Sequence, residues 1–194
     1  MYKLCKTERT AARQRELEQA LLHMLEIQRF EEISVSDLCA WMDVPRKAFY
    51  RYFSDKFGAL AALLDHTWME CELNAIRHAV QDGYGAESLE RFFQFWKQRG
   101  TLLRALERDG MTNLLVERAL VLSHTEPTMF AEFAHAQGEG LREQAVLFIA
   151  GGMVMLLVDW MKRDFAQPCE EMARAAMLLL TTPLIQRRSI FRQG

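Results

Sequence analysis

Apolar residues recur at intervals of three and four along most of the chain, which is the spacing of an amphipathic helix. The stripes predict a first helix at about residues 10–28, short helices at about 35–42 and 45–52, and a long helix at about 55–80, followed by further helices to the C-terminus. No segment shows the sustained alternation of a β-strand. The predicted fold class is therefore all-α, with about nine helices.

Residues typical of helix ends support this division. Ser34, followed three positions later by Asp37, is typical of a capping box at the start of the second helix. Asp43 and Pro45 interrupt the apolar stripe, and proline suits the first turn of a third helix. Ser54 is the expected N-cap of the long fourth helix. Two short helices joined by a turn of about three or four residues form a helix-turn-helix.

The chain of 194 residues has room for one or two domains. We expect residues 1–54 to form a helix-turn-helix domain and residues 55–194 to form a larger helical domain. The helix at 55–80 is expected to bridge the two, since its length suits a helix that spans both.

The third helix is unusual for the side chains that it exposes. Phe49 and Phe53, four residues apart, are expected to face the core. The outer face then carries cations and phenols and no carboxylate: Arg46, Lys47, Tyr50, Arg51 and, near the helix end, Tyr52. Cations neutralise DNA phosphates, phenolic hydroxyls donate to phosphate oxygens, and a helix of this kind fits the major groove.

The charge balance requires any nucleic-acid surface to be local. The formal net charge is −2, which excludes a generally polybasic protein. Residues 1–15, however, hold five Lys or Arg residues against one Glu. Positive charge is therefore concentrated in the N-terminal arm and in the third helix.

Residues 33–60 resemble the DNA-binding motif of the TetR family of one-component bacterial regulators. The matching positions are Ser34, Val35, Leu38, Cys39, Val44, Phe49, Tyr50, Tyr52, Phe53, Lys56 and Leu60. The resemblance implies that Arg46 and Lys47 reach bases, and that the serines, the tyrosines and Lys56 meet phosphates. The expected DNA-binding residues are Ser34, Ser36, Pro45, Arg46, Lys47, Tyr50, Arg51, Tyr52 and Lys56.

Three positions depart from the family's usual motif. Asp43 stands where the turn glycine is usual, and aspartate tolerates the left-handed conformation that the turn needs. Pro45 replaces a serine that caps the third helix, and Ala48 replaces a threonine that often meets phosphate. Fewer phosphate contacts are expected to weaken non-specific DNA binding.

Residues 151–179 resemble the tail of a TetR subgroup in which some members act as activators or coactivators. Two functional hypotheses follow. The first is a ligand-responsive repressor that a small molecule releases from double-stranded operator DNA. The alternative is a TetR-like transcriptional coactivator that acts through a protein partner and binds little DNA itself.

The resemblance also implies an effector pocket and a homodimer built on the last two helices. An apolar or aromatic effector is expected among the middle helices, with candidate contacts from Phe92, Trp96, Met111, Phe130 and Met153. The candidate dimerisation residues are Gly151, Met155, Met172 and Leu179. Gly151 would permit a close approach of helices.

Other classes of protein find little support. The sequence holds no nucleophile-elbow, phosphate-loop or zinc-protease motif, so we expect no enzyme, no cofactor and no metal site. The four cysteines are widely spaced, as in a reduced, cytoplasmic protein. The longest apolar run, residues 145–158, is shorter than the roughly 20 residues that span a bilayer, and it predicts a wholly buried helix without a membrane partner.

Overall fold

The computed structural model describes residues 2–3, 7–79, 85–125, 128–135 and 139–181. Over these residues the chain forms ten α-helices, one short 3₁₀ helix and one isolated β-bridge. The α-helices are α1 (Glu8–Ile27), α2 (Val35–Trp41), α3 (Arg46–Phe49), α4 (Lys56–Ala79), α5 (Ala86–Gln98), α6 (Gly100–Arg108), α7 (Asn113–Thr125), α8 (Met129–His135), α9 (Arg142–Lys162) and α10 (Cys169–Thr181). The all-α prediction is confirmed, with one helix more than the nine expected.

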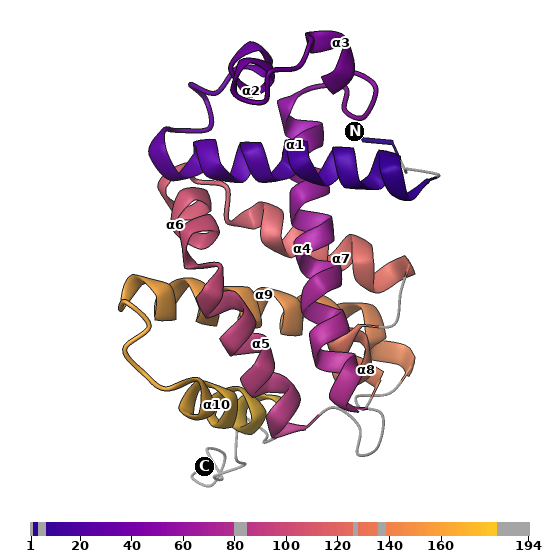
Figure 1. Cartoon of the computed structure of the whole chain (residues 1–194). Helices are drawn as coiled ribbons and strands as arrows, with labels where there is room; N and C mark the ends of the chain where they lie inside the picture. Colours follow the sequence, from indigo (N-terminus) through magenta and orange to yellow (C-terminus); the bar gives the residue numbers. More distant parts are fainter. Residues whose placement is uncertain (1, 4–6, 80–84, 126–127, 136–138, 182–194) are drawn as a thin grey trace, which may run out of the picture.

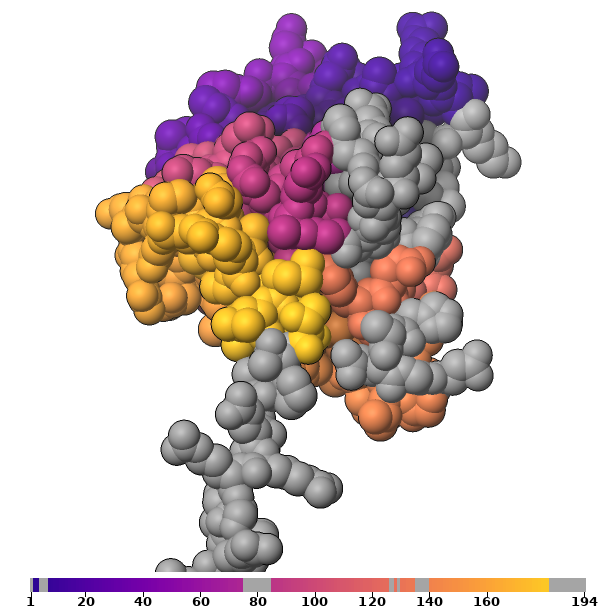
Figure 2. All heavy atoms as spheres, turned by 90° about the horizontal axis from the view of Figure 1, so that it is seen from below, coloured from indigo at the N-terminus to yellow at the C-terminus, as the bar shows by residue number. Residues whose placement is uncertain are grey.

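Figure 1 shows α2 and α3 at one end of the molecule and α10 at the other. Helix α4 runs from beside α1 into the set of helices α5 to α10, and Figure 2 views the far end, where α10 lies at the surface. The buried side chains of the described residues form one contiguous hydrophobic core that includes both ends. The domain boundary between residues 54 and 55 therefore stays a prediction, as does the role of α4 as a bridge between two domains; α4 contacts α1 as well as α5 and α7.

The turn between α2 and α3 is built on a left-handed residue. Asp43 has φ of 51°, which is the conformation expected of the residue that replaces the turn glycine. The Val44 N–H donates to the Cys39 carbonyl at 2.9 Å, and the Asp43 N–H donates to the Ala40 carbonyl at 3.2 Å. These two bonds form a Schellman motif, which satisfies the last carbonyls of α2 and fixes the direction of α3.

Helix α3 is shorter than the sequence predicts. It covers Arg46–Phe49, whereas the expected range was 45–52, and Pro45 occupies the N-cap without a capping side chain. The N–H groups of Tyr52 and Phe53 both donate to the carbonyl of Phe49, so the chain leaves the helix in tight turns. Residues 46–52, called the recognition segment below, thus consist of one turn of α-helix followed by non-helical turns.

The cap of α4 also differs from the prediction. Asp55, and not Ser54, caps the first turn, because its Oδ1 accepts the Gly58 N–H at 2.7 Å. Ser54 instead donates its hydroxyl to Asp55 Oδ2 at 3.1 Å. The backbone hydrogen bond from Gly58 lowers the pKa of Asp55, which keeps the capping carboxylate charged near neutral pH.

Helix α9 is long and apolar enough to cross a membrane by length and composition alone. One side of it is buried in the protein core, through residues such as Ala150, Leu157 and Trp160. A buried core helix meets the same criteria. Phe148 and Met155 on its other side are 70% and 61% exposed, so the expectation that residues 145–158 form a wholly buried helix is wrong.

The end of α6 holds the end of α1. Arg108 donates from Nη2 to the carbonyls of Leu25 and Gln28, at 3.1 and 2.7 Å. Asp109 accepts the Phe30 N–H at 3.0 Å, and its side chain is only 6% exposed. This clamp fixes the helix-turn-helix against the rest of the molecule, and the hydrogen bond from Arg108 lowers the pKa of Asp109.

We expect Asp109→Asn to lower the free energy of unfolding by about 1–3 kcal/mol at pH 7, because it replaces a charged carboxylate that accepts hydrogen bonds from Arg29, Phe30 and Arg108 with a neutral amide. A carboxyl with a lowered pKa in the folded state stabilises above its unfolded pKa of about 3.9. The difference between variant and wild type should therefore shrink as the pH falls below about 4. Urea unfolding at several pH values measures it. The control is Asp164→Asn, whose side chain is 91% exposed and should change stability little.

Candidate DNA interface

The recognition segment exposes the side chains that the sequence predicts. Arg46, Lys47, Tyr50 and Arg51 are exposed, and Tyr52 is half-buried. Phe49 and Phe53 are 0% and 1% exposed, so the expectation that they face the core is confirmed. The outer face of residues 46–52 therefore presents cations and a phenol with no acidic side chain from this segment.

Arg46 and Tyr50 are paired across one helical turn. Arg46 Nη2 donates to the Tyr50 hydroxyl at 3.2 Å, and the guanidinium carbon lies 5.9 Å from the centre of the Tyr50 ring. The hydrogen bond raises the pKa of Arg46, so its charge persists at any physiological pH. The pairing orders a long side chain in advance, which reduces the entropy that binding would cost.

Helix α2 begins with two exposed serines. The hydroxyl of Ser34 accepts the Asp37 N–H at 3.1 Å, and Asp37 Oδ2 accepts the Ser34 N–H at 3.0 Å. The predicted capping box is confirmed. Ser36 is exposed in the first turn beside it. Both serines lie at the positive end of a helix dipole, although the adjacent Asp37 carboxylate offsets part of that charge.

Lys56 has a different role from the one that the family motif implies. Its ammonium donates to three backbone carbonyls, those of Phe30, Glu31 and Ile33, at 2.8 to 2.9 Å. It also lies 4.8 Å from the centre of the Phe30 ring. Because all three ammonium protons have partners, Lys56 holds the loop between α1 and α2 in place and is not poised to bind phosphate.

Sequence reasoning did not single out a basic groove beside the recognition segment. Arg9, Thr10, Ala12, Arg13, Glu16, Arg51 and Tyr52 line a groove of about 670 Å³. Arg13 forms an ion pair with Glu16, and Arg51 comes from the far side of the groove. The excess of cations in residues 1–15 was the available signal, but their meeting with Arg51 depends on how α1 crosses the motif.

The candidate effector residues lie in different parts of the described structure. Phe92, Trp96 and Phe130 are buried and contact Trp68, with ring centres 4.8 to 6.2 Å apart. Trp68 donates its indole N–H to the Leu115 carbonyl at 3.1 Å. Met111 is half-buried against the core, and Met153 lies elsewhere, under a groove between α9 and α10. These rings form the core of the larger part of the molecule.

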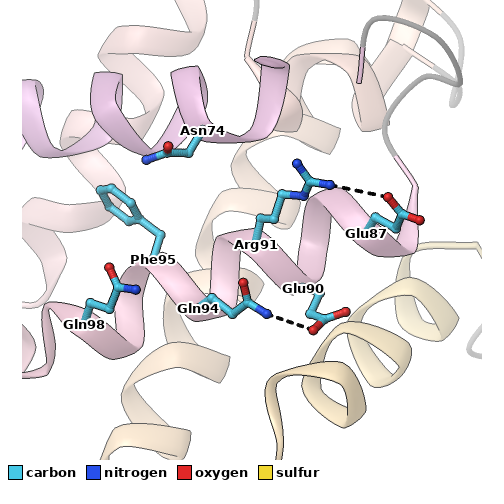
Figure 3. Close-up of a pocket in the computed structure, with 7 residues that line it drawn as sticks. All are labelled: Asn74, Glu87, Glu90, Arg91, Gln94, Phe95 and Gln98. Carbon is cyan, nitrogen blue, oxygen red and sulfur yellow. Dashed lines mark hydrogen bonds and ion pairs between the residues drawn. The ribbon is translucent and has the colours of Figure 1, made fainter. Parts of the chain in front are cut away.

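Figure 3 shows a different groove, of about 600 Å³, between α4 and α5. It is lined by Asn74, Glu87, Glu90, Arg91, Gln94, Phe95 and Gln98. Arg91 contacts Glu87 at 3.4 Å, and Gln94 donates to Glu90 at 2.8 Å. The lining is predominantly polar, so this groove gives no support to an apolar effector.

The outer face of α9 and α10 is strongly apolar. Phe148, Met155 and Leu179 are 70%, 61% and 45% exposed and line a groove of about 480 Å³. Two of the predicted dimerisation residues, Met155 and Leu179, thus lie together on this face, with Gly151 half-exposed on α9. Met172 does not: it is 9% exposed and belongs to the protomer core, because α10 turns it towards α5.

Among the described residues, no group of three or more His, Cys, Asp or Glu side chains is placed to hold a metal ion. Acidic side chains such as Asp65 and Glu70 instead form ion pairs with arginines of other helices. The site that the structure defines most clearly is therefore the exposed basic face of the helix-turn-helix.

Over the described residues, these features define an all-helical protein with a helix-turn-helix at one end. No protein-family model and no curated protein matches the sequence. Several solved structures match the fold. DhaS, a dihydroxyacetone kinase operon activator, matches with a TM-score of 0.59 at 14% identity, over 88% of this chain and 94% of that one. The fatty acid degradation regulator FadR of Bacillus halodurans matches with a TM-score of 0.57 at 14% identity, over 95% and 100%.

A third structure carries the family name. FadR of Thermus thermophilus, a TetR-family transcriptional repressor solved in complex with lauroyl-CoA, matches with a TM-score of 0.52 at 15% identity, over 93% of this chain and all of that one. The chain therefore has the TetR fold, as the resemblance of residues 33–60 implied. At these identities the comparison establishes the fold and not the activity.

Proposed function

We propose that the protein is a homodimeric transcriptional regulator of TetR type that binds operator DNA and responds to a small molecule. The observation that carries this proposal is the exposed basic face of residues 46–52, with Arg46, Lys47 and Arg51 outward and Phe49 and Phe53 buried behind it. Cations on the outer side of the second helix of a helix-turn-helix are placed as DNA recognition requires, and a helix that merely faces solvent does not require them there.

Each side chain of this face has a proposed role. Arg46 and Lys47, at the start of α3, read base edges in the major groove, next to Pro45. Tyr50, Arg51 and Tyr52 bind phosphates, as do the two serines at the start of α2. The groove that contains Arg9 and Arg13 extends the phosphate-binding surface on the same side as Arg51. Lys56 supports the loop and makes no phosphate contact.

A dimer is proposed through α9 and α10. Two recognition helices related by a two-fold axis can read two half-sites of DNA about one helical turn apart. The apolar face that includes Phe148, Met155 and Leu179 is large for an unpartnered surface. Figure 1 shows α10 at the end of the molecule opposite α2 and α3, which leaves α3 accessible.

An effector is proposed to act by population shift. A molecule bound by the larger part of the protein would favour a dimer geometry whose recognition helices no longer match successive major grooves. Lauroyl-CoA in the Thermus FadR structure is an example of a ligand bound by this fold. We propose the groove between α4 and α5 as the site, since α4 continues to the helix-turn-helix, and its polar lining would take a polar effector in place of the apolar one that the sequence led us to expect (Figure 3). We place such a regulator in the cytoplasm and assign it no enzymatic activity.

A second candidate is a coactivator that acts through a protein partner. Helix α3 has only four residues, and Pro45 gives it no side-chain cap, so it can insert less of itself into a groove than a longer helix. The fold is shared with DhaS, which is described as an operon activator. In this case Arg46, Lys47 and Arg51 would not contact DNA bases.

Selection of genomic fragments by the purified protein, followed by fluorescence anisotropy, separates the two candidates. A regulator should bind the selected DNA at nanomolar concentrations and prefer it to scrambled DNA by about 10³-fold or more at physiological salt. Equal and strongly salt-dependent binding to both DNAs would contradict the first candidate and favour the second.

A further inference from the structure

Residues 2 and 3, called the N-terminal segment below, connect residues 52 and 53, which follow the recognition helix α3, to α4 in the middle of the molecule. Tyr2 forms an antiparallel β-bridge with Phe53, and the Lys3 N–H donates to the Tyr52 carbonyl at 2.9 Å. Tyr52 is the last residue of the basic face of residues 46–52, and Phe53 directly follows it. The backbone of this segment therefore holds the residues through which the recognition helix joins α4.

The side chain of Tyr2 continues this connection to a buried carboxylate. Its hydroxyl donates to Asp65 Oδ2 at 2.6 Å, and Asp65 lies in α4 with 7% of its surface exposed. Burial and the hydrogen bond to Asp65 raise the pKa of Tyr2, so the phenol keeps its proton and stays a donor. The ring of His66 lies at its edge, with centres 6.1 Å apart.

Asp65 is in turn held by α7. Arg118 donates from Nε to Asp65 Oδ1 at 2.5 Å and from Nη2 to Oδ2 at 2.6 Å, which is a two-bond, planar contact. One carboxylate thus accepts from the N-terminal segment and from the larger part of the molecule at the same time. A displacement of α7 that moves Arg118 moves the acceptor of Tyr2 as well.

We propose that Tyr2, Asp65 and Arg118 are positioning residues that set the orientation of the recognition helix for DNA and connect it to α7. This inference rests on the proposed DNA-binding function and adds to it a route between the two ends of the molecule. None of the three contacts DNA. They act through Tyr52 and Phe53, whose backbone the N-terminal segment holds.

Tyr2→Phe tests the positioning role, because it removes one hydroxyl and keeps the ring. We expect affinity for the selected DNA to fall about tenfold, the usual effect of losing a hydrogen bond to a charged group. Affinity for scrambled DNA should stay the same, since non-specific binding depends on charge and not on the angle of the helix. The control is Thr67→Val, which removes another buried hydroxyl bond in α4, from Thr67 to the Leu63 carbonyl at 2.7 Å, and should leave both affinities unchanged.

The connection to α7 is tested by combining variants. Arg118→Lys keeps the charge and loses the two-bond contact, so it should also weaken specific binding. If the three residues act as one chain, the double variant with Tyr2→Phe should bind no more than about twofold more weakly than the weaker single variant. Fully additive losses would overturn the connection.

Amide hydrogen exchange provides a readout without DNA. In Tyr2→Phe the amides of residues 50–53 should exchange faster than in wild type, and in Thr67→Val they should not. Unchanged exchange in Tyr2→Phe, or an equal loss of specific and non-specific affinity, would overturn the inference. If the wild-type protein itself fails to distinguish selected from scrambled DNA, the proposed function fails, and the exchange result still decides whether Tyr2 holds the recognition segment.

Discussion

Phe148→Glu is expected to convert the proposed homodimer into a folded monomer. Phe148 lies on the outer face of α9 with 70% of its surface exposed in the protomer, so the change costs the protomer little. In a two-fold dimer the substitution occurs twice, and it places two carboxylates in an apolar interface. Burial of an unpaired charge costs several kcal/mol, so the dimer dissociation constant should rise by about 10³-fold or more.

Sedimentation equilibrium measures this change directly, and circular dichroism shows whether the helices remain. The matched control is Ile27→Glu, at an apolar residue of α1 that is 67% exposed and lies outside the α9–α10 face. The control variant should remain a dimer. A dimeric Phe148→Glu variant would show that α9 does not form the interface. The affinity for operator DNA should also fall when the dimer dissociates, because a monomer binds only one half-site and gains nothing from a linked second half-site.

The features that could be predicted from the sequence are those set by neighbouring residues. The capping box of Ser34 and Asp37 and the left-handed turn at Asp43 each depend on side chains within a few positions. The inward direction of Phe49 and Phe53 follows from their spacing of four. The helix-turn-helix is therefore encoded locally, and its resemblance to the TetR motif reflects the same local requirements.

The features that could not be predicted depend on contacts between distant segments. Lys56 matches the family motif, but three carbonyls of the preceding loop surround its ammonium. Met172 fits the apolar stripe of a dimer helix, yet the packing of α10 on α5 buries it. Periodicity shows that a face is apolar and does not show which partner covers it. For the same reason, Phe92 and Trp96 were expected to line a pocket and instead fill the core.

The polar chain from Tyr2 to Arg118 is the clearest case of this limit. Its members lie 63 and 53 positions apart along the sequence. A tyrosine at position 2 has no periodic context, and Asp65 lies on the apolar stripe of α4, where a charge breaks the pattern. Buried charges require partners, so a carboxylate on such a stripe is a signal that hydrogen-bond donors lie near it in the folded chain. The sequence holds the signal without identifying the partners.

The triple variant Arg46→Ala, Lys47→Ala and Arg51→Ala is expected to abolish specific DNA binding. These three cations are exposed and form the outer face of the recognition segment. A dimer would lose four base-reading cations and two phosphate-binding ones, Arg51 of each protomer, and each phosphate contact contributes about 0.9 to the dependence of log K on log salt. The slope should therefore fall by about 2, and affinity for the selected DNA should fall by about 10³-fold or more at physiological salt because the base contacts are lost as well.

Anisotropy titrations at four salt concentrations measure the slope. The control replaces three exposed cations of the larger part of the molecule, Arg104, Lys162 and Arg163, and should leave slope and affinity unchanged. Single variants separate the roles: Arg46→Ala should relax base preference, whereas Tyr50→Phe should weaken binding to all sequences alike. If the triple variant keeps the wild-type slope, α3 is not the DNA-binding face. The basic face would then be idle, as the coactivator candidate implies.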